Sequence, residues 1–117
     1  MDKNKKRRFY YFGIIAEIIA SIYLRFKFYK IIASRLKTPF GEIDLIAKKN
    51  KTIIFVEIKA RNDTSLMDFI SKHQQQRIIK ASQYFMLSHK KYQHFSLRFD
   101  AIIINKYLWP KHFINYW

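Results

Sequence analysis

An acidic residue lies inside a strongly apolar segment of this 117-residue chain, and this combination restricts how the chain can fold. Residues 53–61 read Ile-Ile-Phe-Val-Glu-Ile-Lys-Ala-Arg, which is typical of a β-strand. Alternation along a strand places Phe55 and Glu57 on one face, and the other face is also apolar. A strand that is apolar on both faces is normally covered on both sides. An ionised carboxylate is costly to remove from water unless a cation compensates it, so Glu57 requires a specific explanation.

The segment before it contains a second acidic residue in a similar setting. Residues 41–47 read Gly-Glu-Ile-Asp-Leu-Ile-Ala, and Asp44 is flanked there by apolar side chains. The polar residues between the two segments predict a hairpin, with Asn50 and Lys51 as a two-residue turn. The two strands are therefore expected to pair in antiparallel fashion.

The register of this hairpin decides whether the acidic residues meet. With a two-residue turn, Asp44 lies directly opposite Glu57, within about 5.5 Å between Cβ atoms. Lys59 is two residues further along the strand and projects from the same face as Glu57. We therefore expect two carboxylates and one ammonium group to converge on one patch of the sheet. A loop with an odd number of residues would separate them.

Two helices are expected outside the hairpin. The first covers residues 14–26, with a wide apolar face formed by Ile15, Ile18, Ile19, Ile22 and Phe26. Glu17 lies off that face, and pairing with a lysine or partial solvation is the simple alternative to a role in a site. The second helix covers residues 72–89, and Ser71 with Gln74 forms a capping box at its start. Ile78, Ala81, Ser82 and Phe85 supply its packing side.

Further strands are expected at residues 28–33, 97–105 and 112–117. The order of helix, three strands, helix and strand predicts an α/β fold, with an antiparallel meander and a parallel strand returned by a crossover helix. Arg98 and Asp100 share a face and are expected to form a structural ion pair. The four histidines are interpreted as surface residues.

Charge and length suggest the kind of partner and the domain organisation. The chain has 23 Lys and Arg against eight Asp and Glu, a formal charge of +15, and no cysteine. A basic surface gains affinity for a polyanion by releasing the counterions of phosphates, so nucleic acid is the expected partner. Residues 1–8 are interpreted as a basic flexible leader, and residues 9–117 as a single domain.

The apolar run at residues 9–24 follows the basic leader and invites comparison with a membrane anchor. The run is shorter than the 18 or more residues of a typical span, and Glu17 interrupts it. We therefore expect a buried helix, no membrane partner and a cytoplasmic protein. The lack of cysteine is consistent with a reducing compartment.

Five sequence blocks carry a resemblance to a known family. They are Gly13-x-x-Ala16-Glu17-x-x-Ala20, Gly41-Glu-Ile-Asp-Leu-Ile-Ala, Phe55-Val-Glu-Ile-Lys-x-Arg61, Arg77-Ile-x-x-Ala81 and Leu97-Arg-Phe-Asp100. In this order they resemble the uncharacterised bacterial YraN family. Asp44 followed by Glu57-Ile58-Lys59 is also similar to the PD-(D/E)xK signature of the restriction-endonuclease-like superfamily, which includes Holliday junction resolvases. The resemblance implies a restriction-endonuclease-like core, a mixed sheet flanked by helices, and allows a homodimer.

The resemblance and the residue chemistry together suggest a metal-dependent nuclease. Mg²⁺ prefers oxygen ligands, and Asp44 and Glu57 would supply them, with Mn²⁺ as an alternative ion. The Ile58 backbone carbonyl is a further candidate ligand, and the resemblance implies that Glu17 joins the site, through a water molecule. Lys59 would position the attacking water or stabilise charge on the phosphate. The catalytic candidates are therefore Asp44, Glu57, Lys59 and Glu17.

Basic residues around this site are candidates for nucleic-acid binding: Arg35, Lys37, Arg61, Lys72 and Arg77. DNA is the expected nucleic acid, but the sequence does not separate DNA from RNA, and no small-molecule cofactor is expected. Two alternatives stay open. One is a catalytically silent nucleic-acid-binding module with the same fold, and the other is a basic structural protein that associates with RNA or a membrane surface.

Overall fold

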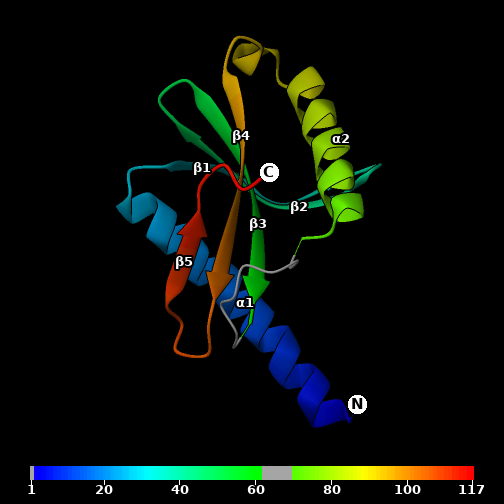
Figure 1. Cartoon of the computed structure of the whole chain (residues 1–117), viewed down its shortest axis with the longest axis vertical. Coiled ribbons are helices and arrows are strands. Elements are labelled where there is room, and N and C mark those ends of the chain that lie inside the picture. Colours follow the sequence, from blue (N-terminus) through cyan, green and yellow to red (C-terminus); the bar gives the residue numbers. More distant parts are fainter. Residues whose placement is uncertain (1, 62–69) are drawn as a thin grey trace.

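The computed structural model describes residues 2–61 and 70–117, which form a sheet with a long helix on each face (Figure 1). In chain order the elements are α1 (Lys3–Phe26), β1 (Lys30–Thr38), β2 (Gly41–Lys49), β3 (Thr52–Ala60), α2 (Lys72–Ser88), a short 3₁₀ turn η1 (Lys90–Tyr92), β4 (Ser96–Ile104) and β5 (Pro110–Phe113). The strands follow one another in the order β1-β2-β3-β4-β5, and all neighbours are antiparallel except β3 and β4. The predicted α/β class and the mixed sheet are confirmed.

The parallel pairing of β3 and β4 explains the position of α2. Because β3 and β4 run in the same direction, the chain must return across the sheet between them, and α2 lies in that connection. The strand predicted at residues 28–33 corresponds to β1, which starts and ends later than expected, at Lys30–Thr38. The last strand lies earlier than expected, at Pro110–Phe113.

Alternating residues of the central strands fill two separate cores. Ile54 and Val56 of β3 pack towards α1, whereas Ile53 and Phe55 pack towards α2. This double burial is what the two-sided apolar pattern predicts. The α2 core contains Ile78, Ala81 and Phe85, as expected, and the Phe55 and Phe85 rings meet edge to face with centroids 5.8 Å apart.

The face of α1 that packs on the sheet differs from the predicted one. The buried residues are Ala16, Ala20 and Leu24, which are 1% exposed or less. The predicted apolar face is largely on the outside, with Ile15, Ile18, Ile22 and Phe26 between 41% and 81% exposed, and Ile19 only partly buried. Small side chains allow the helix axis to approach the sheet closely, and this close approach decides the packing face here.

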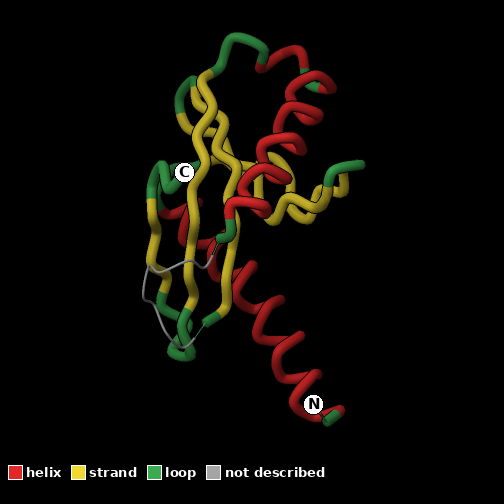
Figure 2. Tube along the Cα trace, turned by 45° about the vertical axis from the view of Figure 1, so that its right-hand side comes forward, coloured by secondary structure: helices red, strands yellow, loops and turns green. Residues whose placement is uncertain are grey.

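Helix α1 also begins earlier than predicted. It starts at Lys3, where the Asp2 side chain caps it by accepting a hydrogen bond of 2.8 Å from the Lys5 amide. The basic leader is therefore helical, and its N-terminal end extends beyond the sheet (Figures 1 and 2). In the described part of the chain, α1 is the one helix with the length and apolar composition to cross a membrane, a test that core helices and signal sequences also pass.

The β1–β2 hairpin turns away from the rest of the sheet. The pairing of β2 with β3 extends from Lys49 opposite Thr52 to Leu45 opposite Val56, while β2 continues to pair with β1 as far as Gly41. The two central strands therefore separate at the next positions, and Figure 2 shows the hairpin projecting sideways towards α2. Arg35 in β1 has a positive φ of 51° at this bend. The sheet is thus split at one defined place.

The start of α2 is partly as predicted. Ser71 caps the helix, its side chain accepting a hydrogen bond of 3.1 Å from the Gln74 amide. The Gln74 side chain does not complete the capping box, because its amide nitrogen donates to Glu57 instead, at 2.9 Å. The Ser71 cap therefore fixes where α2 begins, and this start brings the Gln74 side chain to Glu57 of β3.

Candidate functional site

The two predicted acidic residues lie at the place where β2 and β3 separate. The register that pairs Leu45 with Val56 makes Asp44 and Glu57 the next two residues on the separating strands. The turn at Asn50, with φ of 55°, is the two-residue turn on which this register depends. The predicted two-residue turn is therefore confirmed, whereas the strand pairing ends one pair before Asp44 and Glu57.

Asp44 takes the place of a backbone acceptor where the ladder ends. Its Oδ2 atom accepts a hydrogen bond of 2.8 Å from the Ile58 amide, which no longer faces a paired strand. Burial raises the pKa of Asp44, the Ile58 amide opposes this rise, and the nearby Glu17 charge adds to it. A partly buried carboxylate that lies near another acid favours the approach of a cation.

Glu57 is the more strongly perturbed of the two acids. It is 7% exposed, and its Oε1 atom lies 2.9 Å from the Gln74 side-chain nitrogen and 3.4 Å from Lys59 Nζ. Burial and the charge of Asp44 raise the pKa of Glu57 to about 7, although Lys59 and Arg77 act in the opposite direction. The cations around Glu57 therefore do not fully compensate the negative charge of the pair.

The Ile58 carbonyl is directed to the same place. Within a strand, the amide and the carbonyl of one residue point to the same side. Because the Ile58 amide reaches Asp44, its carbonyl also faces the opening between β2 and β3. The carbonyl oxygen is therefore a feasible third oxygen ligand beside the two carboxylates.

Glu17 reaches the site from α1 but is held by a cation. Its Oε2 atom accepts a hydrogen bond of 2.6 Å from Arg35 Nε, and the Glu17 side chain is 25% exposed. The charge of Glu17 raises the pKa of Asp44, which places the two carboxylates in one electrostatic neighbourhood. Arg35, predicted to bind phosphate, thus also fixes the position of an acidic residue.

The remaining basic candidates surround this centre unequally. Arg77 lies against the turn between β1 and β2, where a Cβ on Gly41 would be 2.8 Å from its Cδ atom, and its charge lowers the pKa of Glu57. Lys37 is an exposed residue of the hairpin, and Lys72 is exposed in the first turn of α2. Arg61 follows the end of β3, where its amide donates to the Ile104 carbonyl at 3.0 Å.

The donor set fits a magnesium ion that is completed by other oxygen ligands. Within residues 2–61 and 70–117, no three acidic, histidine or cysteine side chains gather closely enough to form a metal site alone. Mg²⁺ is commonly held by one or two carboxylates plus water and substrate phosphate, so two acids suffice. The contacts of Glu57 with described residues all involve Oε1, and those of Asp44 involve Oδ2. Each acid therefore has a second oxygen to offer.

Asp100, by contrast, belongs to a structural network. This fully buried carboxylate accepts two hydrogen bonds from Arg98, at 2.8 and 2.9 Å, and one of 2.9 Å from the Asn115 amide. His112 Nε2 lies 2.7 Å from the same carboxylate, and these partners lower the pKa of Asp100 despite its burial. The predicted ion pair is confirmed.

The interpretation of all four histidines as surface residues was wrong. The His112 side chain is 5% exposed and lies between Asp100 and the Tyr23 hydroxyl, which is 3.2 Å from its Nδ1 atom. His89 is partly buried and stacks on Phe85, with ring centroids 4.0 Å apart. Alternation along β5 gave no signal for His112, because Phe113 packs on the opposite face of the strand and both faces are covered.

One member of the site was missed from the sequence. Gln74 contacts Glu57 directly, but its spacing from Ser71 is explained equally well by a capping box. The available signal was its place in the first turn of a helix that follows the acidic strand. The capping interpretation concealed this second role.

Comparison with known proteins assigns a family. The model of "Uncharacterised protein family UPF0102" matches residues 16–104, which include both central strands and Glu17. A UPF0102 protein of Rhodopseudomonas palustris (strain BisB18) is 44% identical over 86% of this chain and 75% of its own length.

Two other relatives match over similar lengths. A UPF0102 protein of Nitrobacter winogradskyi is 39% identical over 88% of each chain, and one of Bartonella tribocorum is 39% identical over 96% of this chain and 87% of its own. The family model covers the second half of α1, all of α2 and the strands β1 to β4. The chain therefore belongs to the uncharacterised protein family UPF0102.

Proposed function

We propose that this protein binds nucleic acid and hydrolyses its phosphodiester bonds with Mg²⁺ at the split between β2 and β3. The observation that carries the proposal is the arrangement of Asp44 and Glu57 where these strands separate, with Lys59 Nζ 3.4 Å from Glu57. Burial raises the pKa values of both acids; the charge of Asp44 adds to the rise at Glu57, and the charge of Glu17 adds to the rise at Asp44. A buried and a partly buried carboxylate that repel each other are most simply stabilised together by one divalent cation.

Asp44, Glu57 and the Ile58 carbonyl would hold the ion. When bound, Mg²⁺ would polarise the scissile phosphate and lower the pKa of the attacking water. Mn²⁺, which also favours carboxylate and carbonyl oxygens, would serve in the same site. These residues come from rigid strands, so their positions are fixed before substrate binds.

The other side chains have roles that do not depend on the ion. Lys59 is 27% exposed in its side chain, so its ammonium group can donate to a substrate phosphate or to water as well as to Glu57. Gln74 fixes the orientation of Glu57 through a hydrogen bond of 2.9 Å. Arg35 holds Glu17 near the site, where the carboxylate can accept a hydrogen bond from a water molecule.

The charge of the molecule supports the substrate class. A formal charge of +15 favours a polyanion, and Arg77 and Lys72 lie on the helix that carries Gln74. Contacts of such residues with phosphates hold a nucleic-acid backbone without reading its sequence. A resolvase-like preference for branched DNA, in line with the resemblance to Holliday junction resolvases, belongs to this proposal.

Cleavage assays test the proposal directly. Labelled single-stranded, duplex and four-way-junction DNA and a single-stranded RNA are incubated with the protein in Mg²⁺ or Mn²⁺ and with EDTA. We expect metal-dependent products that Lys59→Ala reduces by about a hundredfold or more, the scale of losing one charged transition-state contact. Lys51→Ala, which removes the same charge from the exposed hairpin turn, is the matched control and should cleave normally. Absence of any product from the wild-type protein would overturn the proposal.

A catalytically silent binding module is the second candidate, and one observation favours it. Glu57 already contacts Lys59 and Gln74, and Glu17 already contacts Arg35, so each has an internal partner without an ion. In that case Mg²⁺ would not change the thermal stability of the protein. Nucleic-acid binding would then persist unchanged in the variants Asp44→Asn and Glu57→Gln.

A further inference from the structure

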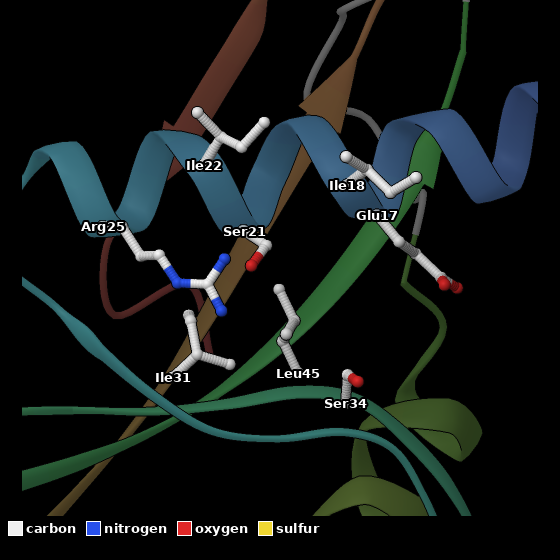
Figure 3. Close-up of a pocket in the computed structure, with 8 residues that line it drawn as sticks. All are labelled: Glu17, Ile18, Ser21, Ile22, Arg25, Ile31, Ser34 and Leu45. Carbon is white, nitrogen blue, oxygen red and sulfur yellow. The ribbon is translucent and has the colours of Figure 1, made fainter.

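A pocket of about 230 Å³ lies between α1 and the β1–β2 hairpin, and it begins at Glu17 (Figure 3). Its apolar surface comes from Ile18 and Ile22 of α1 and from Ile31 and Leu45 of the sheet. The pocket is small for a drug-sized ligand, because the pockets that bind such ligands have volumes of about 300–1,000 Å³. Its size therefore suits a phosphate with part of a sugar better than a whole nucleotide.

The polar groups of the pocket form a line along α1. Glu17, Ser21 and Arg25 follow one another at intervals of four residues, which places them on one side of the helix. Ser34 faces them from β1. Figure 3 shows the Arg25 side chain folded back towards Ser21, with its guanidinium group between the helix and the strands.

Apart from Glu17, which pairs with Arg35, these polar groups have no partners among the described residues. The structure shows no hydrogen bond or ion pair for the Arg25 guanidinium or for the Ser21 and Ser34 hydroxyls. Two serines of α2, by contrast, donate hydrogen bonds within their own helix: the Ser82 hydroxyl to the Ile79 carbonyl at 2.6 Å, and the Ser88 hydroxyl to the Tyr84 carbonyl at 3.0 Å. Arg25 and Ser34 are exposed and Ser21 is partly buried, so a ligand can reach these donors from solvent.

We infer that this pocket binds a backbone phosphate of the nucleic acid near the scissile bond, with Arg25, Ser21 and Ser34 as its donors. The inference rests on the proposed function, because it places one strand of the substrate along α1 from Glu17 to Arg25. Eight residues of helix span about 12 Å, which is about the distance between phosphates two nucleotides apart in an extended strand. The strand therefore passes from the acidic site to Arg25 without leaving the surface.

The charges of the pocket agree with this occupant. Arg25 is the cation among the residues that line it, and a guanidinium group can donate two parallel hydrogen bonds to a phosphate. Glu17 is the one acid in the lining, and its charge is balanced by Arg35 at 2.6 Å. The apolar walls would contact the sugar, so the pocket recognises the backbone and not the base.

The first test measures binding alone. A short fluorescein-labelled single-stranded DNA is titrated with the wild-type protein, Arg25→Ala and Lys27→Ala at several salt concentrations without metal. We expect Arg25→Ala to weaken binding about tenfold and to reduce the salt slope by about one, as loss of one phosphate contact does. Lys27→Ala removes the same charge two residues away, outside the pocket, and should change both quantities much less. Equal effects of the two variants would overturn the inference.

The second test places the phosphate relative to the cleaved bond. Substrates carry one neutral methylphosphonate linkage at successive positions, and single-turnover cleavage is followed in Mg²⁺. One linkage near the cleaved bond should slow the wild-type protein as Arg25→Ala does, and it should add nothing in that variant. Additive losses at every position would overturn the inference. If the wild-type protein binds but never cleaves, the proposed function fails, and the binding test still decides whether Arg25 holds a phosphate.

Discussion

Glu57 is the single residue whose titration reports most directly on the site. Its pKa is raised from 4.5 to about 7 in the fold. Between these values the folded protein keeps the proton that the unfolded chain has lost, so the free energy of unfolding falls as the pH rises through this range. A shift of this size corresponds to about 3 kcal/mol.

Substitution of Glu57 should remove this pH dependence. In EDTA at pH 8, we expect Glu57→Gln to be more stable than the wild-type protein by up to about 3 kcal/mol, and the two should converge near pH 4. Urea unfolding at both pH values measures the difference. Glu42→Gln, an exposed change in the same hairpin, is the control and should leave the difference near zero. If the wild-type protein were as stable as Glu57→Gln at pH 8, this would contradict the raised pKa of Glu57.

Asp100 should behave in the opposite way. Its pKa is lowered by His112, Arg98 and the Asn115 amide, so its contribution to stability is present above the ordinary Asp range and is lost as the pH falls below it. Asp100→Asn leaves Arg98 without its buried partner and should destabilise the protein by about 3–5 kcal/mol at pH 7. Urea unfolding checks this, and stabilisation by Mg²⁺ should be unchanged in the variant. Loss of the metal effect would mean that Asp100 belongs to the site.

At the scale of elements, the placement of the β1–β2 hairpin against α2 depends on Gly41. Its φ is 130°, a conformation that side chains rarely adopt, and an added Cβ would lie 2.8 Å from Arg77 Cδ. We expect Gly41→Ala to destabilise the protein by about 1–3 kcal/mol and to displace Arg77. Gly13→Ala is the matched control, because no atom lies within 4 Å of its added Cβ in α1, and it should stabilise by about 0.5–1 kcal/mol. Thermal unfolding of both variants checks the prediction, and equal changes would contradict it.

The elements differ in how well the sequence predicted them. The hairpin register could be predicted, because a two-residue turn and a period of two leave one way to pair the strands, which places Asp44 beside Glu57. The face of α1 could not, because the pattern of large apolar residues indicated one side, and close packing of Ala16 and Ala20 against the sheet selected another. Helix packing depends on how closely two surfaces approach, and periodicity alone does not report that distance.

The residues of the candidate site also fall into those that the sequence could place and those that it could not. Asp44, Glu57 and Lys59 could be placed by counting along one hairpin, since every step was local. Gln74 and Arg35 come from other elements and contact the acids only through the tertiary fold. The split between β2 and β3, which creates the opening, also has no sequence signal beyond the acids that line it.

At the scale of the whole molecule, the net charge makes a prediction of its own. With a formal charge of +15, affinity for nucleic acid should fall linearly with salt on a double-logarithmic plot. A protein that contacts six to ten phosphates loses about a thousandfold or more between roughly 50 and 200 mM salt. Fluorescence anisotropy measures this slope, and Glu57→Gln should leave it unchanged. An affinity that does not depend on salt would contradict a phosphate-binding surface.

The most direct test of the central claim is the thermal stability of the protein with and without Mg²⁺. If Asp44 and Glu57 share an ion, Mg²⁺ at about ten times its Kd should stabilise the wild-type protein by about 1.4 kcal/mol, seen as a rise in Tm. Asp44→Asn should abolish that rise, and the exposed Glu42→Gln should keep it. A wild-type Tm that Mg²⁺ and Mn²⁺ leave unchanged, or a rise that persists in Asp44→Asn, would contradict a metal site between β2 and β3.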